Sequence, residues 1–371
     1  MTTDPSPLPS WAPPDGPDPD GDPAPDDASR PRAADIAVVG DVHLQWDAED
    51  AAYFRDAPYA CVLFVGDLAG YSHRGGLGVA RSIAGLGRRA LVLPGNHDGI
   101  HVGQLVAEVV RERRLARLLD RGQERRCAAL RAALGDATLC GYSLHHVATA
   151  VGPLGVVAAR PHSMGGSYIA YEGYIGRRFG VRSVEASARC LQSLVDRCPH
   201  ERLLFLAHCG PTGLGAGRAD IWGCDFKAEE GDWGDEDLRR AIAHARGRGK
   251  QVLAVIAGHM HHAVKNGGRR PWSVEHDGVL YVNAARVPRI FRDGEDVVRH
   301  HVALRITGKG ARAVEVLRRM PDGAHAGGVG RGAASARVAG AIAAWLVRRG
   351  RRAGALNRPP PAPPRSAAAS S

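Results

Sequence analysis

The sequence predicts an α/β fold, and two observations lead to this prediction. Short apolar runs rich in Val, Ile and Leu recur along the chain, each bounded by Gly or Pro, as is typical of strands covered on both faces. Stretches with helical spacing of apolar residues lie between these runs, and such alternation is typical of α/β proteins. The runs are Ile36–Val39, Cys61–Val65, Leu91–Leu93, Leu203–Ala207 and Val252–Ala257.

The helical stretches and the last strands complete the expected pattern. Leu105–Leu134 has apolar residues at helical spacing with many Arg and Glu between them, and we expect one long helix there. Glu236–Arg246 is a second helix, with Asp235 as its expected N-cap. Val279–Asn283 and Val297–Ile306 are expected as two late strands.

Composition divides the 371 residues into three regions. Residues 1–34 are rich in Pro, Asp and Ala and are expected to form a disordered acidic tail. Residues 35–320 have the pattern of a globular domain. Residues 321–371 contain an Ala- and Arg-rich stretch, Ala333–Arg352, and a Pro-rich tail. That stretch is expected to be a helix that packs on its own domain, with a partner or an anionic surface as the alternative.

Charge and apolar patterning exclude some classes of protein. The net charge is +10, and residues 1–30 hold seven Asp and one Arg, so the remainder carries +16. A basic body favours anionic partners such as phosphates or nucleic acid, although Arg as the general surface cation explains it equally well. No apolar run is long enough to span a bilayer, and the first thirty residues lack the features of a signal peptide. Seven Cys without CxxC spacing indicate reduced thiols, so a cytoplasmic protein is expected.

Polar side chains follow each of the five apolar runs. The runs are followed by Gly40-Asp41-Val42-His43, Gly66-Asp67, Gly95-Asn96-His97-Asp98, His208-Cys209 and Gly258-His259-Met260-His261. Because ligands in α/β folds bind outside the carboxyl ends of the strands, these side chains are expected to converge on one crevice.

The donor types indicate a metal site. Carboxylate, amide and imidazole donors without thiolate suit manganese, iron or zinc. One ion with an open position would not use seven donors, whereas two ions bridged by a carboxylate would. Two ions about 4 Å apart form a clamp for in-line displacement at phosphorus and activate the attacking water. The donors are Asp41, His43, Asp67, Asn96, His208, His259 and His261.

Each of these residues also has an ordinary structural interpretation. Asp41 and Asp67 could cap helices, Asn96 could be a turn residue, and His208 could be a hydrogen-bonded core histidine. These interpretations do not explain why all the residues follow strands.

The order GDxH, GD, GNHD, isolated His and GHxH resembles the calcineurin-like metallophosphoesterase family, over roughly residues 35–305. The resemblance implies a four-layer αββα sandwich of two mixed β-sheets flanked by helices, with a helical and loop insertion near the metal site at about residues 100–200. It also implies two divalent metal ions, with manganese favoured and iron or zinc as alternatives. In addition, two segments, Arg160–Tyr168 and Trp222–Asp235, resemble a little-studied subgroup associated with photosynthetic lineages, which implies no substrate.

The resemblance also implies residue roles. Asp41, His43 and His261 would hold the first metal. Asn96, His208 and His259 would hold the second, and Asp67 would bridge the two. His97 would contact the substrate phosphate and assist the leaving group, with Asp98 orienting its ring. Gly70 departs from the commoner GDxxD/N form, which puts one supporting contact in doubt.

Substrate choice rests on weaker signals. Between His97 and His208 lie 110 residues, including a Gly-rich loop in which Arg160 is expected to bind the substrate phosphate. The segment Trp222–Asp235 is expected at the mouth of the site. The expected function is a phosphatase acting on a small molecule or phosphoprotein. A phosphodiesterase or nuclease is the alternative, although 5% aromatic residues give nucleic acid little support. A non-catalytic binding module would not need His97 and seven ligands.

Overall fold

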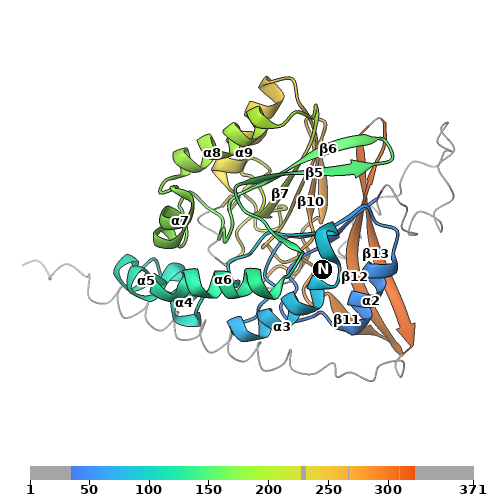
Figure 1. Cartoon of the computed structure of the whole chain (residues 1–371), viewed down its shortest axis with the longest axis horizontal. Coiled ribbons are helices and arrows are strands. Elements are labelled where there is room, and N and C mark those ends of the chain that lie inside the picture. Colours follow the sequence, from blue (N-terminus) through green and yellow to red (C-terminus); the bar gives the residue numbers. More distant parts are fainter. Residues whose placement is uncertain (1–34, 227–230, 266, 309, 322–371) are drawn as a thin grey trace, which may run out of the picture.

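The computed structural model describes residues 35–226, 231–265, 267–308 and 310–321. The tails predicted at residues 1–34 and beyond 321, including the helix expected at Ala333–Arg352, lie outside the described residues, so those expectations stay predictions. Within the described residues, two β-sheets pack face to face (Figure 1).

The first sheet is mixed. Strands β1 to β4 are parallel to one another, whereas β12 runs antiparallel to β1. One edge of β12 is shared by β11 and β1, and its other edge pairs with β13. The strands are β11 (Ile290–Asp293), β12 (Asp296–Ile306), β1 (Ile36–Val39), β2 (Cys61–Phe64), β3 (Ala90–Val92), β4 (Thr138–Leu139) and β13 (Ala311–Pro321).

The second sheet is also mixed. Its four inner strands, β6, β7, β8 and β10, are parallel, and the edge strands β5 and β9 are antiparallel to their neighbours. In spatial order the strands are β5 (Ser143–Thr149), β6 (Gly152–Ala158), β7 (Arg202–Cys209), β8 (Gln251–Gly258), β10 (Val279–Asn283) and β9 (Ser273–His276).

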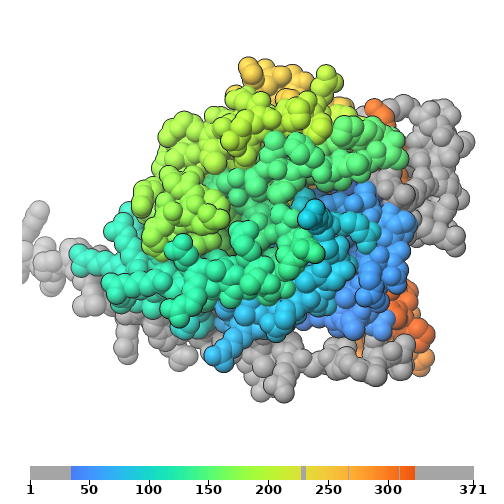
Figure 2. Space-filling model, in the orientation of Figure 1, coloured from blue at the N-terminus to red at the C-terminus, as the bar shows by residue number. Residues whose placement is uncertain are grey.

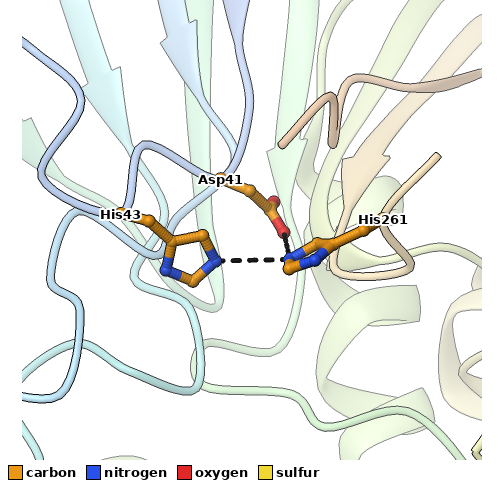
Figure 3. A group of neighbouring side chains, drawn as sticks. All are labelled: Asp41, His43 and His261. Atoms are coloured by element: carbon orange, nitrogen blue, oxygen red, sulfur yellow. Dashed lines mark hydrogen bonds and ion pairs between the residues drawn. The ribbon is translucent and has the colours of Figure 1, made fainter. Parts of the chain in front are cut away.

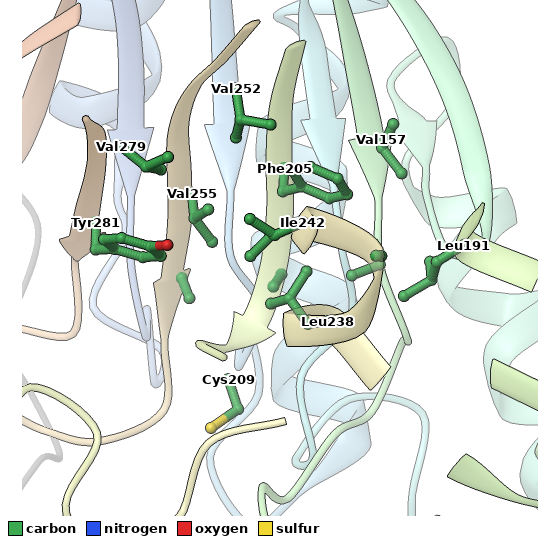
Figure 4. Packing of buried hydrophobic residues seen from close by; sticks show 14 of the residues in the cluster. Val157, Leu191, Phe205, Cys209, Leu238, Ile242, Val252, Val255, Val279 and Tyr281 are labelled. Carbon is green, nitrogen blue, oxygen red and sulfur yellow. The ribbon is translucent and has the colours of Figure 1, made fainter. Parts of the chain in front are cut away.

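Helices cover the outer face of each sheet and complete four layers. Helices α2 (Ala48–Asp56), α3 (His73–Ala84) and α6 (Gln123–Ala133) pack on the first sheet. Helices α8 (Val184–Arg197) and α9 (Glu236–Gly247) pack on the second, as Figure 4 shows for α9 over Phe205 and Val255. Alternate strand residues face inward, so Val38 of β1 and Leu204 of β7 share the central core. The predicted αββα sandwich of two mixed sheets is confirmed.

A small lobe lies at one end of the sandwich. Helices α4 (Val102–Val109) and α7 (Glu172–Phe179) contribute to the lobe's own apolar cluster, which includes Tyr171 and Ile175, and α5 (Arg113–Leu119) packs against α4. The segment of α5 and the turn that follows it lies beside α7 (Figure 2), and Arg177 of α7 pairs with Asp120 of that turn at 2.9 Å. The described residues also contain two 3-10 turns, Gly87–Arg89 before β3 and Asp120–Gly122 between α5 and α6.

The region predicted as one long helix contains three. The chain breaks after α4, where Arg111 has a left-handed φ of 55° and the Glu112 N–H returns to the Ala107 carbonyl. Apolar spacing continues across this break, which explains why periodicity alone missed it. The expected insertion at about 100–200 is also divided. Its β4, β5, β6, α6 and α8 belong to the sandwich layers, and the remaining helices form the lobe.

No helix among the described residues is both long enough and apolar enough to cross a membrane.

Candidate metal centre

The seven predicted metal ligands converge at the carboxyl ends of β1, β2, β3, β7 and β8. Four of them, Asp41, His43, Asp67 and His259, have left-handed φ angles of 37°, 43°, 52° and 70°. Such backbone conformations cost free energy and persist where the surrounding structure enforces them, commonly at functional sites. The glycine before a ligand has a steric role, because a Cβ atom on Gly258 would overlap the Asp41 carboxylate.

The first group of ligands is Asp41, His43 and His261 (Figure 3). One ligand atom from each lies within 4.8 Å of the others. The Nε2 atoms of His43 and His261 are 3.3 Å apart, and His261 Nε2 is 3.3 Å from Asp41 Oδ2. Two imidazoles and a carboxylate thus point at a common centre.

The second group is Asn96, His208 and His259. The Oδ1 atom of Asn96 lies 2.8 Å from His208 Nε2 and 3.0 Å from His259 Nδ1. An amide oxygen and two imidazole nitrogens therefore form a second cluster of donors.

Asp67 lies between the two groups. Its Oδ2 is 3.6 Å from His43 Nε2 in the first group, and its Oδ1 is 3.6 Å from His208 Nε2 in the second. The two oxygens of one carboxylate thus face different clusters, which is the arrangement a bridging ligand requires.

Backbone carbonyls fix the imidazole rings. The second ring nitrogen of His43 lies 3.2 Å from the Ala69 carbonyl, that of His208 lies 2.6 Å from the Val65 carbonyl, and that of His259 lies 3.1 Å from the Met164 carbonyl. A ring that donates to a carbonyl through one nitrogen presents the lone pair of the other, which is how metal-binding histidines are oriented.

Burial and charge favour cation binding. Asp41 is fully buried, and its Oδ2 lies 3.3 Å from His261 Nε2. Burial alone would raise the pKa of Asp41, but the bond to His261 and the neighbouring histidines hold it well below its usual range. Burial lowers the pKa of His43 to about 4 and that of His259 to about 3, so both rings are neutral at pH 7 and able to bind metal. The donor set and the buried carboxylate of Asp41 therefore fit divalent metal ions.

His97 lies beside Asp67, close to both groups. Its Nδ1 donates to the Gly70 carbonyl at 2.8 Å, and its Nε2 is 4.0 Å from Asp67 Oδ2. The absence of a polar side chain at Gly70 is therefore compensated by that residue's own backbone. Tyr71 adds an edge-on ring contact with centroids 5.4 Å apart.

Asp98 does not orient His97, contrary to the expectation from the sequence. Its carboxylate is buried and accepts from the backbone N–H groups of Ala69, at 3.0 Å, and Gly95, at 2.9 Å. Asp98 thus ties together the loops that follow β2 and β3. Its influence on His97 is indirect, because the next residue after Ala69 supplies the carbonyl that holds the ring.

Arg160 does not offer a free guanidinium to a substrate. Its side chain is 2% exposed and forms ion pairs with Asp235 and Asp237, and it donates to the Tyr168 carbonyl at 2.6 Å. The expected phosphate contact is therefore corrected to an internal one. The same network explains why Asp235, although it precedes α9, makes no side-chain cap bond, since its carboxylate binds Arg160 and Ser163.

The segment Trp222–Asp235 also differs from expectation. Trp222 and Trp233 are buried in the core beside the second sheet and do not form an open mouth. Trp222 donates through its indole to the Gly258 carbonyl at 3.2 Å, so it supports the loop that carries His259.

Sequence reasoning missed three supporting residues. His162 and Tyr171 contact the loop that carries Asn96, and Arg270 donates through Nε to the His261 carbonyl at 2.8 Å. No motif marks such residues, because their partners are backbone carbonyls that any sequence provides.

Comparison with known proteins assigns the family. The model of the calcineurin-like phosphoesterase family matches residues 34–263, which is more than half of the chain, so the chain belongs to this family. Its members typically bind two divalent metals. Among solved structures, Vacuolar Protein Sorting 29 from Cryptosporidium parvum is similar at 8% identity and a TM-score of 0.26. That match covers 77% of this chain and 98% of the other. Comparison with curated proteins finds no match.

Proposed function

We propose that this protein is a two-metal phosphatase that hydrolyses phosphomonoesters of a small molecule or a phosphoprotein. The observation that carries the proposal is the position of Asp67, with one carboxylate oxygen toward each of two three-residue donor groups and His97 alongside. We propose that Asp41, His43 and His261 hold one ion, that Asn96, His208 and His259 hold the other, and that manganese occupies both.

Bound ions would supply Lewis-acid activation of the phosphoryl group and of the attacking water. The protein's own contribution is a fixed geometry and a proton donor. Because the Nδ1 of His97 is engaged with the Gly70 carbonyl, Nε2 is the nitrogen that faces the reacting group. A protonated His97 would deliver its Nε2 proton to the leaving oxygen, which otherwise departs as an unstable alkoxide.

A phosphodiesterase or nuclease remains the second candidate, favoured by the charge of +16 outside residues 1–30. A cation-rich surface concentrates polyanions, but it equally serves other phosphorylated substrates. The cytoplasmic location expected from the sequence is part of the proposal and accords with a phosphatase that acts on intracellular phosphoesters.

The test compares manganese-loaded protein on a phosphomonoester and a phosphodiester of the same chromogenic alcohol. Faster monoester cleavage supports the proposal, and faster diester cleavage replaces it with the second candidate. His97→Ala is the control, because contaminating phosphatase would survive this substitution. Metal content of His97→Ala, measured by mass spectrometry, should match wild type, since His97 is not a proposed ligand. Equal turnover by His97→Ala and wild type would exclude the assigned role of His97.

A further inference from the structure

We propose that the segment of residues 162–171, here called the support segment, positions the ligands of the second metal and not those of the first. Tyr171 is its principal positioning residue. The inference rests on the proposed function, because it assigns residues to one of the two proposed metal positions. It starts from three hydrogen bonds that join this segment to the second ligand group.

Two of these bonds hold the loop that carries Asn96. The Tyr171 hydroxyl donates to the Asn96 carbonyl at 2.8 Å, and His162 Nδ1 lies 3.0 Å from the Gly95 carbonyl. Consecutive peptide groups are thereby fixed, and with them the direction of the Asn96 side chain. The third bond joins His259 Nε2 to the Met164 carbonyl at 3.1 Å.

The support segment is itself firmly held. The Met164 carbonyl also accepts from Trp233 Nε1 at 2.6 Å. Ser163 donates to the buried Asp235 at 2.8 Å, and Asp235 in turn pairs with Arg160. The segment therefore has few alternative positions, which is what precise placement of a ligand requires.

Tyr171 joins the segment to the lobe. Its side chain is 1% exposed, its φ is 53°, and its backbone N–H donates to Glu108 Oε1 at 2.9 Å. Glu108 belongs to α4, so the lobe sets the position of the Tyr171 hydroxyl. This gives the lobe a function at the metal centre, although it supplies none of the seven ligands.

The first ligand group is held by other parts of the chain. His43 is oriented by the Ala69 carbonyl, and the backbone at His261 is held by Arg270. Loss of a contact in the support segment should therefore weaken the second metal selectively. Removing a hydrogen bond that orients a metal ligand lowers metal affinity by about 10- to 100-fold.

Manganese titration of metal-free full-length protein tests this inference. Tyr171→Phe keeps the ring and deletes only the hydroxyl. Tyr174→Phe is the matched control, because this tyrosine is buried in the same lobe cluster and its hydroxyl contacts Cys127 instead of a ligand loop. Calorimetry gives the two binding steps, and electron paramagnetic resonance distinguishes a coupled manganese pair from a single ion. Thermal melting of the metal-free proteins checks that both variants fold.

We expect wild type and Tyr174→Phe to bind two ions. Tyr171→Phe should bind the first ion normally and the second about tenfold or more weakly, with a single-ion spectrum at intermediate manganese. Unchanged binding by Tyr171→Phe, equal weakening of both steps, or the same effect in Tyr174→Phe would overturn the inference. Wild type that binds fewer than two ions would instead overturn the proposed two-metal function, and this inference with it.

A second pair of variants keeps the test decisive if Tyr171→Phe is unstable. His162 has a φ of 58°, which Asn and Asp tolerate. His162→Asn retains a donor toward the Gly95 carbonyl, and His162→Asp replaces it with an acceptor of the same shape. The Asn variant should keep the second binding step, and the Asp variant should weaken it. Equal affinity for the second manganese ion in the two variants would contradict the inference.

Discussion

Replacement of Arg160 by Met distinguishes the internal role that the structure assigns from the substrate contact that the sequence suggests. The substitution removes a guanidinium that lies between two buried carboxylates, Asp235 and Asp237. Breaking a buried ion pair by removing one partner costs about 3–5 kcal/mol, because the remaining charge stays uncompensated. We expect the free energy of unfolding of the variant to be about 3 kcal/mol lower at pH 7. This is the lower end of that range, because Asp235 relieves part of the penalty by binding a proton.

The relief by protonation sets the pH dependence of this loss. Burial, supported by the charge of Asp237, raises the pKa of Asp235 to about 7 even with Arg160 present. Without Arg160 that pKa rises further. When the pKa of an acid is higher in the folded than in the unfolded state, the folded protein loses stability as pH rises toward the folded-state pKa. The difference in the free energy of unfolding between wild type and variant should therefore grow above pH 7, by about 1.4 kcal/mol per pH unit.

Urea unfolding at pH 7, 8 and 9 measures the free energy of unfolding of wild type and variant. Arg319→Met is the control, because Arg319 pairs with Asp293 at an exposed position and its loss should leave stability unchanged within error. A difference in the free energy of unfolding below about 1 kcal/mol at pH 7, or a difference independent of pH, would refute the internal role of Arg160. A raised KM in a variant that is as stable as wild type would instead support Arg160 as a substrate-binding residue.

Three further predictions concern the site and the core. Asp67→Asn should lose metal from both positions, since one carboxylate faces both groups, and metal analysis after dialysis should show a content well below that of wild type. Asp98→Asn should cost about 2 kcal/mol in urea unfolding, because an amide nitrogen would oppose one of two backbone donors; unchanged stability would contradict this. Burial lowers the pKa of His262 to about 4 from 6.5, so its contribution to stability is present above pH 6.5 and lost as pH falls toward 4. The advantage of wild type over His262→Gln should accordingly shrink below pH 6.5 in urea unfolding, and a constant difference would count against it.

Much of the site was predictable because its chemistry is repeated at strand ends. Each of the five apolar runs is followed by a polar donor, and parallel strands place such residues at one edge of a sheet. Six strands, β4, β5, β6, β9, β11 and β13, were not predicted, and for β5 and β13 the reason is their exposure. Strand β5 has the sequence SLHHVAT and is half-exposed, and most of β13 is exposed or partly buried, so neither has the apolar run that marks a covered strand.

The partners of individual side chains were less predictable. Asp98 stands next to His97 in the sequence, yet its carboxylate turns toward the Ala69 and Gly95 amides. Arg160 lies in a Gly-rich loop typical of phosphate binding, yet it forms buried ion pairs with Asp235 and Asp237, which are 75 and 77 positions later in the sequence. Adjacency and composition do not determine which of several nearby partners a side chain meets.

The sequence by itself determined the α/β class, the seven candidate ligands and the family, because strand periodicity and donor chemistry are encoded locally. Only the tertiary structure decided that Asp67 divides its oxygens between two groups, that the Gly70 carbonyl holds His97, and that Tyr171 supports Asn96. These contacts join residues 24 to 141 positions apart, and two of them use backbone carbonyls. A carbonyl is present at every position, so its use as a partner leaves no signature in the sequence.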